Sequence, residues 1–241
     1  MRTQEARAPR SVLLTALLAA VVTAGVIVAV ILLRPAAPAP AGDPGAPPVS
    51  DNAQTTPGIG CGDSACREIG AMTVGGLPVV LLADEAGKQG VVRIGADTVY
   101  PLIVNDMGVT LKGDSLRCVD GATPVCLVRG EVNGGSAGEL FVARGGIWRD
   151  TGKPYFSDAG TVTLDDVTAD GIADVIVVRH ECPGAQSGSA RCQAAPVLAE
   201  VYDVARGSVS CTRRYTAPSA LRGWPDVRLT KADLRACPER E

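Results

Sequence analysis

The chain has 241 residues, a formal net charge of −3, 46% hydrophobic residues and 3% aromatic residues. This slightly acidic balance and the shortage of aromatic rings leave neither a phosphate-binding face nor a series of base-stacking surfaces, so no nucleic acid is expected as a partner. Arginine outnumbers lysine, and alanine, glycine, valine and proline are abundant, a bias typical of GC-rich genomes such as those of actinobacteria. The first 60 residues differ in composition from the rest, and the remainder is long enough for one domain with its own core.

The amino-terminal segment predicts a membrane anchor. Residues 11–33, SVLLTALLAAVVTAGVIVAVILL, carry no charged side chain, and a helix of this length, at ~1.5 Å per residue, exceeds the ~30 Å hydrocarbon core of a bilayer. Arg2, Arg7 and Arg10 precede the segment against a single acidic residue, so the positive-inside rule makes residues 1–10 a cytoplasmic tail and places the rest outside the cell. The alternative is a cleaved signal peptide and a secreted protein, although the apolar core of a signal peptide is usually only about 7–15 residues long.

Residues 34–60 are rich in proline and alanine and lack aliphatic periodicity, which predicts an extended tether between the membrane and a folded domain at 61–241. All eight cysteines lie in that domain, an even number on the side of the membrane where thiols oxidise. Zinc knuckles of the CxxC kind are absent from the sequence, so disulfides are expected rather than a zinc site. The short spacings favour pairing of neighbours: Cys61 with Cys66, Cys118 with Cys126, Cys182 with Cys192, and Cys211 with Cys237.

The folded part is expected to be mainly β, as an antiparallel domain. Short β-branched and apolar runs alternate with glycine-rich or polar turns, and no window keeps helical spacing over three turns. One short helix is expected within residues 229–240, where Thr230 and Asp233 fit a capping box. The predicted strands lie in the runs 77–83, 90–95, 98–104, 109–113, 125–132, 139–146, 161–166, 174–180, 197–207 and 208–215.

Two segments resemble each other at a shift of 35 residues. VRGEVNGGSAGELFVAR, residues 128–144, and TLDDVTADGIADVIVVR, residues 163–179, both predict a strand, an acidic loop and a second strand, and Glu139 matches Asp174 in this alignment. Such spacing is typical of a repeated β-unit in a propeller or solenoid. Within the mainly β class, we therefore expect a reduced propeller-like array that follows one amino-terminal transmembrane helix.

The aspartate loop, residues 165–174, places oxygen-bearing side chains at alternating positions. This pattern is typical of a calcium loop, in which glycine permits the sharp reversal and a backbone carbonyl supplies a further ligand. Position 12 of the loop is valine, however, where an EF-hand needs glutamate, and a strand begins at once, so an EF-hand is excluded. The positions that would hold the ion are Asp166, Thr168, Asp170 and Asp174 through side chains and Ile172 through its carbonyl.

The segment DVTADGIADVIVV, residues 166–178, resembles the FG-GAP (VCBS, integrin-type) repeat, in which a DxDxDGxxD loop precedes a hydrophobic strand of a β-propeller blade. The resemblance implies a structural calcium ion held by Asp166, Asp170 and Asp174. Thr168 stands where the family usually has Asp or Asn, which weakens such a site. The alternative is a plain hairpin turn, in which the neighbouring carboxylates accept hydrogen bonds from backbone amides.

Three short motifs match catalytic patterns without their structural context. GGSAG at 134–138 fits the G-x-S-x-G nucleophile elbow, yet a strand rather than a helix is expected to follow it. GDSL at 113–116 is similar to the motif of a serine hydrolase family but lacks that family's DxxH, and GDSAC at 62–66 adjoins a predicted disulfide. His180, the only histidine, is expected to be a strand-end side chain bonded to a backbone carbonyl rather than a catalytic base.

The sequence thus predicts a membrane-anchored, extracytoplasmic, non-catalytic binding or structural module of the cell envelope. Its expected partners are the cytoplasmic membrane, through residues 11–33, and an envelope protein or cell-wall polymer. One alternative is a cell-envelope serine hydrolase that uses Ser136 or Ser115 with His180. Another is an extracellular sensor or accessory domain, although a cytoplasmic tail of ten residues is too short for an output domain.

Overall fold

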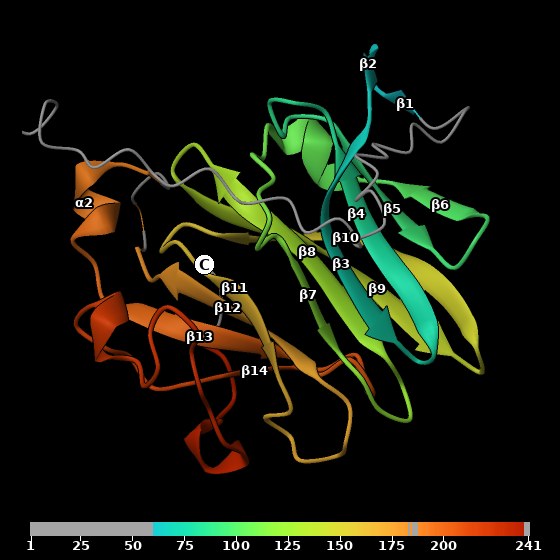
Figure 1. Cartoon of the computed structure of the whole chain (residues 1–241). Helices are drawn as coiled ribbons and strands as arrows, with labels where there is room; N and C mark the ends of the chain where they lie inside the picture. The colour runs from blue at the N-terminus through green and yellow to red at the C-terminus, as the bar shows by residue number, and fades with distance from the viewer. Residues whose placement is uncertain (1–59, 183, 185–187, 239–241) are drawn as a thin grey trace, which may run out of the picture. The chain divides into compact units, whose positions relative to one another are not determined.

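The computed structural model describes residues 60–182, 184 and 188–238 (Figure 1). The predicted tail 1–10, the predicted membrane helix 11–33 and all but the last residue of the predicted tether lie outside the described residues. Within those ranges no helix is both long and apolar enough to cross a membrane. The described part is mainly β with antiparallel sheets, which confirms the predicted fold class.

Three antiparallel sheets of four strands make up most of the fold, and in each sheet strands that follow one another in the chain are neighbours. The first sheet contains β3 (Arg67–Val74), β4 (Leu77–Ala83), β5 (Gly90–Ile94) and β6 (Thr98–Pro101). The second contains β7 (Leu116–Val119), β8 (Val125–Val132), β9 (Gly135–Arg144) and β10 (Ile147–Ser157). The third contains β11 (Val162–Asp165), β12 (Asp174–His180), β13 (Val197–Tyr202) and β14 (Val209–Cys211).

Glycine pairs make two of the tight hairpin turns. Gly75 and Gly76 join β3 to β4 with φ of 59° and 75°, and Gly145 and Gly146 join β9 to β10 with φ of 58° and 78°. A two-residue turn that matches the right-handed twist of its strands needs positive φ at both central residues, which glycine adopts without steric cost. These turns therefore set the register of their hairpins locally.

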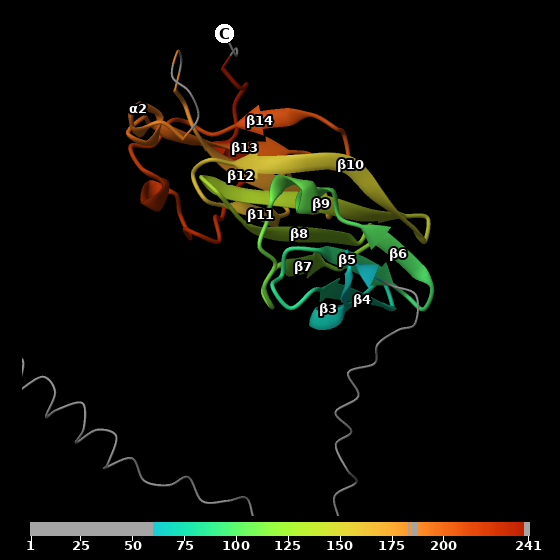
Figure 2. The ribbon, with the colours of Figure 1, turned by 90° about the horizontal axis from the view of Figure 1, so that it is seen from above.

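The three sheets lie over one another as successive layers (Figure 2). Leu81 of the first sheet and Phe141 of the second belong to one buried cluster, whereas Leu127 of the second and Val175 of the third belong to another. The second sheet is thus buried on both faces. This double burial explains why the first half of β8, residues 125–128, is a continuous apolar run rather than an alternation of apolar and polar residues.

The two outer faces of the stack are covered by segments held by disulfides. On the first sheet, Val80 and Leu82 pack against Cys61 of the hairpin formed by β1 (Gly60–Cys61) and β2 (Ser64–Ala65). On the third sheet, Ile176 packs in one cluster with Leu221 of the carboxyl-terminal segment. All four predicted disulfides are confirmed: Cys61–Cys66, Cys118–Cys126, Cys182–Cys192 and Cys211–Cys237.

Some elements differ from the predictions. β3, β7 and β10 were not expected, and residues 109–113 form no strand but contribute one isolated bridge, between Thr110 and Glu131. β10 contains Gly152 and Pro154, which disfavour strands, yet it pairs with β9 across a bulge at the edge of its sheet. An edge strand tolerates proline because one side of its backbone needs no sheet partner. Pairing with β9 therefore makes β10 a strand, although its own residues have a weak preference for strand structure.

The prediction of a carboxyl-terminal helix is wrong except for a single turn. The chain forms only the 3₁₀ turn η3 (Lys231–Asp233), although the predicted capping box between Thr230 and Asp233 is present. The chain is extended from Leu234, because Arg235 exchanges two backbone hydrogen bonds with Cys211. The other short helices are η1 (Ile103–Met107), η2 (Pro218–Ala220) and α2 (Ala190–Gln193).

The two similar segments both form strand, turn and strand, but at different places in their sheets. Residues 128–144 contribute to β8 and β9, the second and third strands of the second sheet. Residues 163–179 contribute to β11 and β12, the first and second strands of the third sheet. The 35-residue shift therefore does not relate equivalent strands of two sheets.

Candidate functional site

The aspartate loop connects β11 to β12 at one end of the third sheet. Its reversal uses two residues in the left-handed region, Ala169 with φ of 56° and Gly171 with φ of 83°. Ala169 is the one non-glycine residue with positive φ in the described part of the chain. A left-handed alanine is strained by about 1–2 kcal/mol, so surrounding hydrogen bonds must hold this conformation.

Carboxylates within the loop supply those hydrogen bonds. The two oxygens of Asp166 accept from the backbone N–H groups of Asp170, at 3.1 Å, and Gly171, at 3.0 Å. Asp170 in turn accepts from the N–H of Ile172 at 3.1 Å through Oδ1. Aspartates that cap nearby amides are typical of stable turns. The hairpin-turn interpretation of the loop therefore has direct geometric support.

Asp174 is different, because it is buried and only half satisfied. It begins β12 and is 0% exposed, and its Oδ2 accepts from the N–H groups of Val167, at 3.1 Å, and Thr168, at 3.0 Å. Its Oδ1 and the Thr168 hydroxyl are both buried without a hydrogen-bond partner. Burial raises the pKa of Asp174 above its usual range, in opposition to the backbone hydrogen bond from Thr168. An orphaned buried oxygen of this kind is costly and is expected to attract a proton or a cation.

A guanidinium group lies against the loop. Arg206, in the turn between β13 and β14, places Nη1 at 3.2 Å from Asp170 Oδ2 and 2.8 Å from Asp203 Oδ2. Burial alone would raise the pKa of Asp203, but hydrogen bonds from Arg206 and the charge of its guanidinium lower it overall. Part of the negative charge around the loop is thus balanced by a residue more than thirty positions away in the chain.

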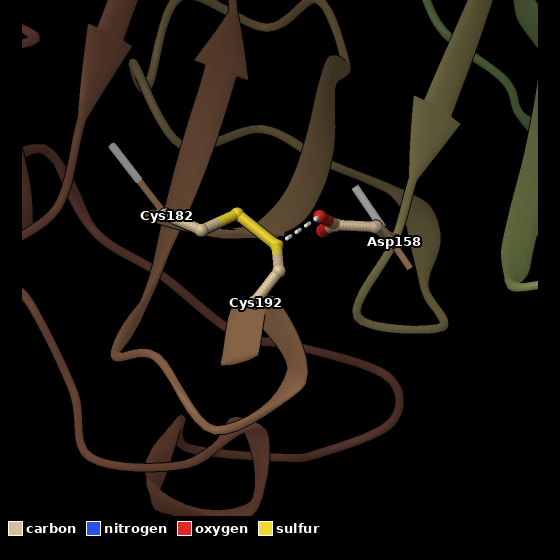
Figure 3. Close-up of side chains that lie close together, drawn as sticks. All are labelled: Asp158, Cys182 and Cys192. Atoms are coloured by element: carbon tan, nitrogen blue, oxygen red, sulfur yellow. Dashed lines mark hydrogen bonds between the residues drawn. A yellow bond between two sulfur atoms is a disulfide. The ribbon is translucent and has the colours of Figure 1, made fainter. Parts of the chain in front are cut away.

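The predicted calcium ligands all lie on this one loop, yet they do not form a compact ligand cluster. Across the described ranges, the one group of three acidic, histidine or cysteine ligand atoms within 4.8 Å of one another is Asp158, Cys182 and Cys192 (Figure 3). Its two sulfurs are bonded to each other, and Cys192 Sγ lies 3.8 Å from Asp158 Oδ2. A disulfide offers no thiolate, so this cluster lacks the donors of a metal site.

The candidate catalytic residues are not brought together. Ser136 donates to the carbonyl of Gly130 at 3.2 Å, and the Ser115 hydroxyl accepts from the N–H of Lys112 at 2.8 Å. Both serines line a cavity of about 170 Å³, whose lining does not include His180. Within the described ranges no hydrogen bond joins either hydroxyl to the His180 imidazole, although the hydrolase alternative requires one.

His180 also differs from its expected role. Its ring Nδ1 lies 3.4 Å from Asp158 Oδ1, which also accepts the backbone N–H of His180 at 2.8 Å. The side chain therefore faces a carboxylate rather than a backbone carbonyl.

Glu139 is a chemically notable residue that no sequence motif marks as a site residue. It is 0% exposed, its Oε2 accepts from the N–H of Val104 at 3.2 Å, and its Oε1 has no partner. Burial raises its pKa to about 7, with Asp150 adding to the shift. The alignment that matched Glu139 to Asp174 was the available signal, because both positions hold buried, half-satisfied carboxyls.

The comparisons with known proteins provide no relative for this chain. No protein-family model, no curated protein and no solved structure matches it.

Proposed function

We propose that this chain is a membrane-anchored, extracytoplasmic module of the cell envelope with a non-catalytic binding or structural role, whose aspartate loop holds calcium as a structural ion. In this proposal residues 11–33 anchor the chain and residues 34–60 carry the domain away from the membrane. The arginines before the apolar segment and the four disulfides beyond it support that orientation.

The sheet arrangement supports a reduced propeller-like array. Each sheet is a four-stranded meander, which is the composition of a propeller blade, and the sheets are stacked face to face. The aspartate loop joins the first two strands of the third meander and directly precedes the apolar strand β12. The FG-GAP-like segment thus lies before a hydrophobic strand, as the resemblance implies.

Asp174 is the observation that carries the calcium proposal. Its free Oδ1, the free Thr168 hydroxyl and the unused lone pairs of Asp166 and Asp170 are hard oxygen donors, which calcium prefers. A bound cation would satisfy the orphaned Asp174 oxygen and keep that carboxyl ionised. The backbone carbonyl of Ile172 would complete the predicted set.

Calcium is expected to stabilise the fold. For a site of ~10 μM affinity, raising calcium from none, in EDTA, to ~1 mM should add about 2.7 kcal/mol to the free energy of unfolding. Thermal unfolding of the purified, oxidised full-length chain measures this as a rise of several degrees. Asp170→Ala and Asp174→Asn should each abolish the rise.

Asp84 offers a matched control for these substitutions. It is also a loop aspartate, and its Oδ1 accepts from the N–H groups of Lys88, at 2.6 Å, and Gln89, at 3.1 Å. Asp84→Ala should therefore lower stability by about 1 kcal/mol through loss of capping and leave the calcium response intact. A native chain whose unfolding temperature is the same in EDTA and in calcium would contradict the calcium proposal and leave the loop a structural turn.

Arg206 is expected to compete with calcium for Asp170. Because the ion pair at 3.2 Å is exposed on the arginine side, its loss should tighten calcium binding by only about threefold. Isothermal titration of Arg206→Gln with calcium measures this change. Lys112→Gln, which removes an exposed ion pair with Glu131, should leave the affinity unchanged. Weaker calcium binding in Arg206→Gln would show that the arginine supports the site rather than competing for it.

A further inference from the structure

A cavity of about 420 Å³ opens between the second and third sheets. Its floor is apolar and belongs to the edge of the core between these sheets, with Leu140 and Val142 from β9, Tyr155 from β10 and Tyr202 from β13. The two tyrosine rings meet edge to face with centroids 5.0 Å apart. A volume of this size lies within the ~300–1,000 Å³ usual for small-molecule sites.

Unequal strand lengths explain why this part of the core stays open. β9 and β10 have 10 and 11 residues, whereas the facing edge strand β14 has only 3. The bulge in β10 between Asp150 and Pro154 places extra residues at the rim, among them Thr151 and Lys153. The third sheet is therefore too short to cover the part of β9 and β10 that extends beyond Val142. The resulting gap is part of the fold and needs no mobile segment.

The rim of the cavity is cationic. Arg144, Arg149 and Lys153 line it, and within the described ranges neither Arg149 nor Lys153 has a carboxylate partner. The ammonium of Lys153 lies 4.9 Å from the ring centroid of Tyr202, directly above the aromatic floor. Positive charge above an apolar surface complements a molecule with an anionic head and an apolar body.

The two acids in the lining offset only part of this charge. Asp203 pairs with Arg206, which lies outside the lining, and accepts its backbone N–H at 2.8 Å. Asp150 accepts the N–H of Gly152 at 2.8 Å and lies close enough to Glu139 to raise the pKa of that carboxyl. Because Arg206 neutralises Asp203, the three cations of the rim outnumber the one remaining acid, Asp150, and the net charge of the lining is positive.

We propose that this inter-sheet cavity binds a small amphipathic anion, with an aromatic or branched aliphatic body on the floor formed by Tyr155, Tyr202 and Val142 and a carboxylate or phosphate at Arg149 and Lys153. The inference rests on the proposed non-catalytic binding role and supplies the chemical class of its ligand. It does not involve the aspartate loop, so calcium binding and anion binding succeed or fail separately.

The test uses three naphthalene derivatives that differ only in the head group. 2-Naphthoate and 2-naphthyl phosphate are expected to bind the full-length chain at one site with a dissociation constant of about 0.1 mM, and neutral 2-naphthol about tenfold more weakly. Isothermal titration, or ligand-observed NMR at a fixed detergent concentration, measures all three. The tighter of the two anions identifies the head group as carboxylate or phosphate.

Variants locate the site. Removing both rim charges, by Arg149→Gln with Lys153→Gln, should weaken both anions about tenfold and leave 2-naphthol unchanged. Val209→Trp, at a half-exposed lining position, should fill the mouth and weaken all three compounds. The matched control is Arg117→Gln with Lys112→Gln, which removes the same charge from β7, the opposite edge strand of the second sheet, and from the segment just before it.

Equal affinity for the anions and the neutral alcohol, or equal loss in the rim and control variants, would overturn the proposal. Absence of any difference between the native chain and Val209→Trp would do the same, because binding would then lie outside the cavity. The calcium-dependent rise in unfolding temperature, measured on the same preparations, tests the structural-ion proposal independently of these outcomes.

Discussion

Replacing Cys211 and Cys237 by serine is expected to lower the free energy of unfolding by about 3.5 kcal/mol. The bond closes the longest disulfide loop of the chain, with a sequence separation of 26, so its loss releases the most conformational entropy in the unfolded state. Urea unfolding of the native chain and the double variant at constant pH measures the difference.

This bond also holds the cover of the third sheet in place. The described segment after β14 contains short 3₁₀ turns and isolated β-bridges at Tyr215 and Arg235, yet its Leu221 and Leu229 are 2% and 7% exposed against the outer face of that sheet. Without the disulfide, the backbone pairing of Cys211 with Arg235 is the remaining tie at the end of this segment. Hydrogen exchange in the double variant should therefore quicken first in β13 and β14.

The Cys61–Cys66 bond provides the comparison. Its sequence separation is only 5, so the same entropy argument gives a loss of about 2 kcal/mol for the corresponding serine variant. Exchange in the third sheet should not change in that variant. Equal stability losses from the two pairs would contradict loop closure as the source of the effect.

The second large effect is a fall in stability with rising pH that originates at Glu139. Its pKa rises from the ordinary 4.5 to about 7 in the folded state, chiefly through burial. Between these two values the folded chain binds more protons than the unfolded chain, so the free energy of unfolding decreases as the pH rises. A shift of this size corresponds to about 3 kcal/mol lost across the window, with a plateau above it.

Glu139→Gln should remove this dependence. The amide keeps the shape of the side chain, can accept the N–H of Val104 and can donate to Asp150, and it does not ionise. The variant is therefore expected to be more stable than the native chain at pH 8 and to match it near pH 4.5. Denaturant unfolding at half-unit steps of pH measures both curves.

Glu131→Gln is the control for Glu139→Gln. The Glu131 side chain is 76% exposed and pairs with Lys112, so its substitution should leave the slope of the native curve unchanged. A native chain whose stability does not fall between pH 5 and pH 7.5 would show that Glu139 ionises freely in the folded state. The pKa of Asp174 is also raised in the folded state. Bound calcium should therefore reduce the contribution of Asp174 to the pH dependence of the free energy of unfolding.

The sequence predicted the bounds of three strands, each of which is buried over four or more consecutive residues. β4, β8 and β12 have the bounds of the predicted apolar runs 77–83, 125–132 and 174–180. An interior strand buried on both faces needs apolar residues at consecutive positions, and that demand is visible locally. β10 was missed because its edge position tolerates proline, lysine and glycine, and the partner that makes it a strand is β9.

The candidate site also has some features that the sequence predicts and others that depend on tertiary packing. Because the aspartate loop is one short segment, the placement of Asp166, Asp170 and Asp174 on one turn between two strands followed from their spacing alone. Its balancing cation, Arg206, and the burial that shifts Asp174 come from the third sheet and its packing. The serines and His180 show the reverse case, since their order along the chain suggested a catalytic set, whereas the hydrogen bonds described for Ser136 and Ser115 and the ion pair described for His180 go to other groups.

By itself the sequence determined the β class, the interior strands and the four disulfide pairs, because alternation, apolar runs and short loop closures act over a few residues. The membrane anchor and the tether stay predictions from the same kind of local pattern. Only the tertiary structure decided which carboxyls lose water, which arginine balances the aspartate loop, and where two sheets of unequal strand length leave a cavity. Those properties depend on contacts between segments far apart in the chain, and local sequence periodicity does not predict such contacts.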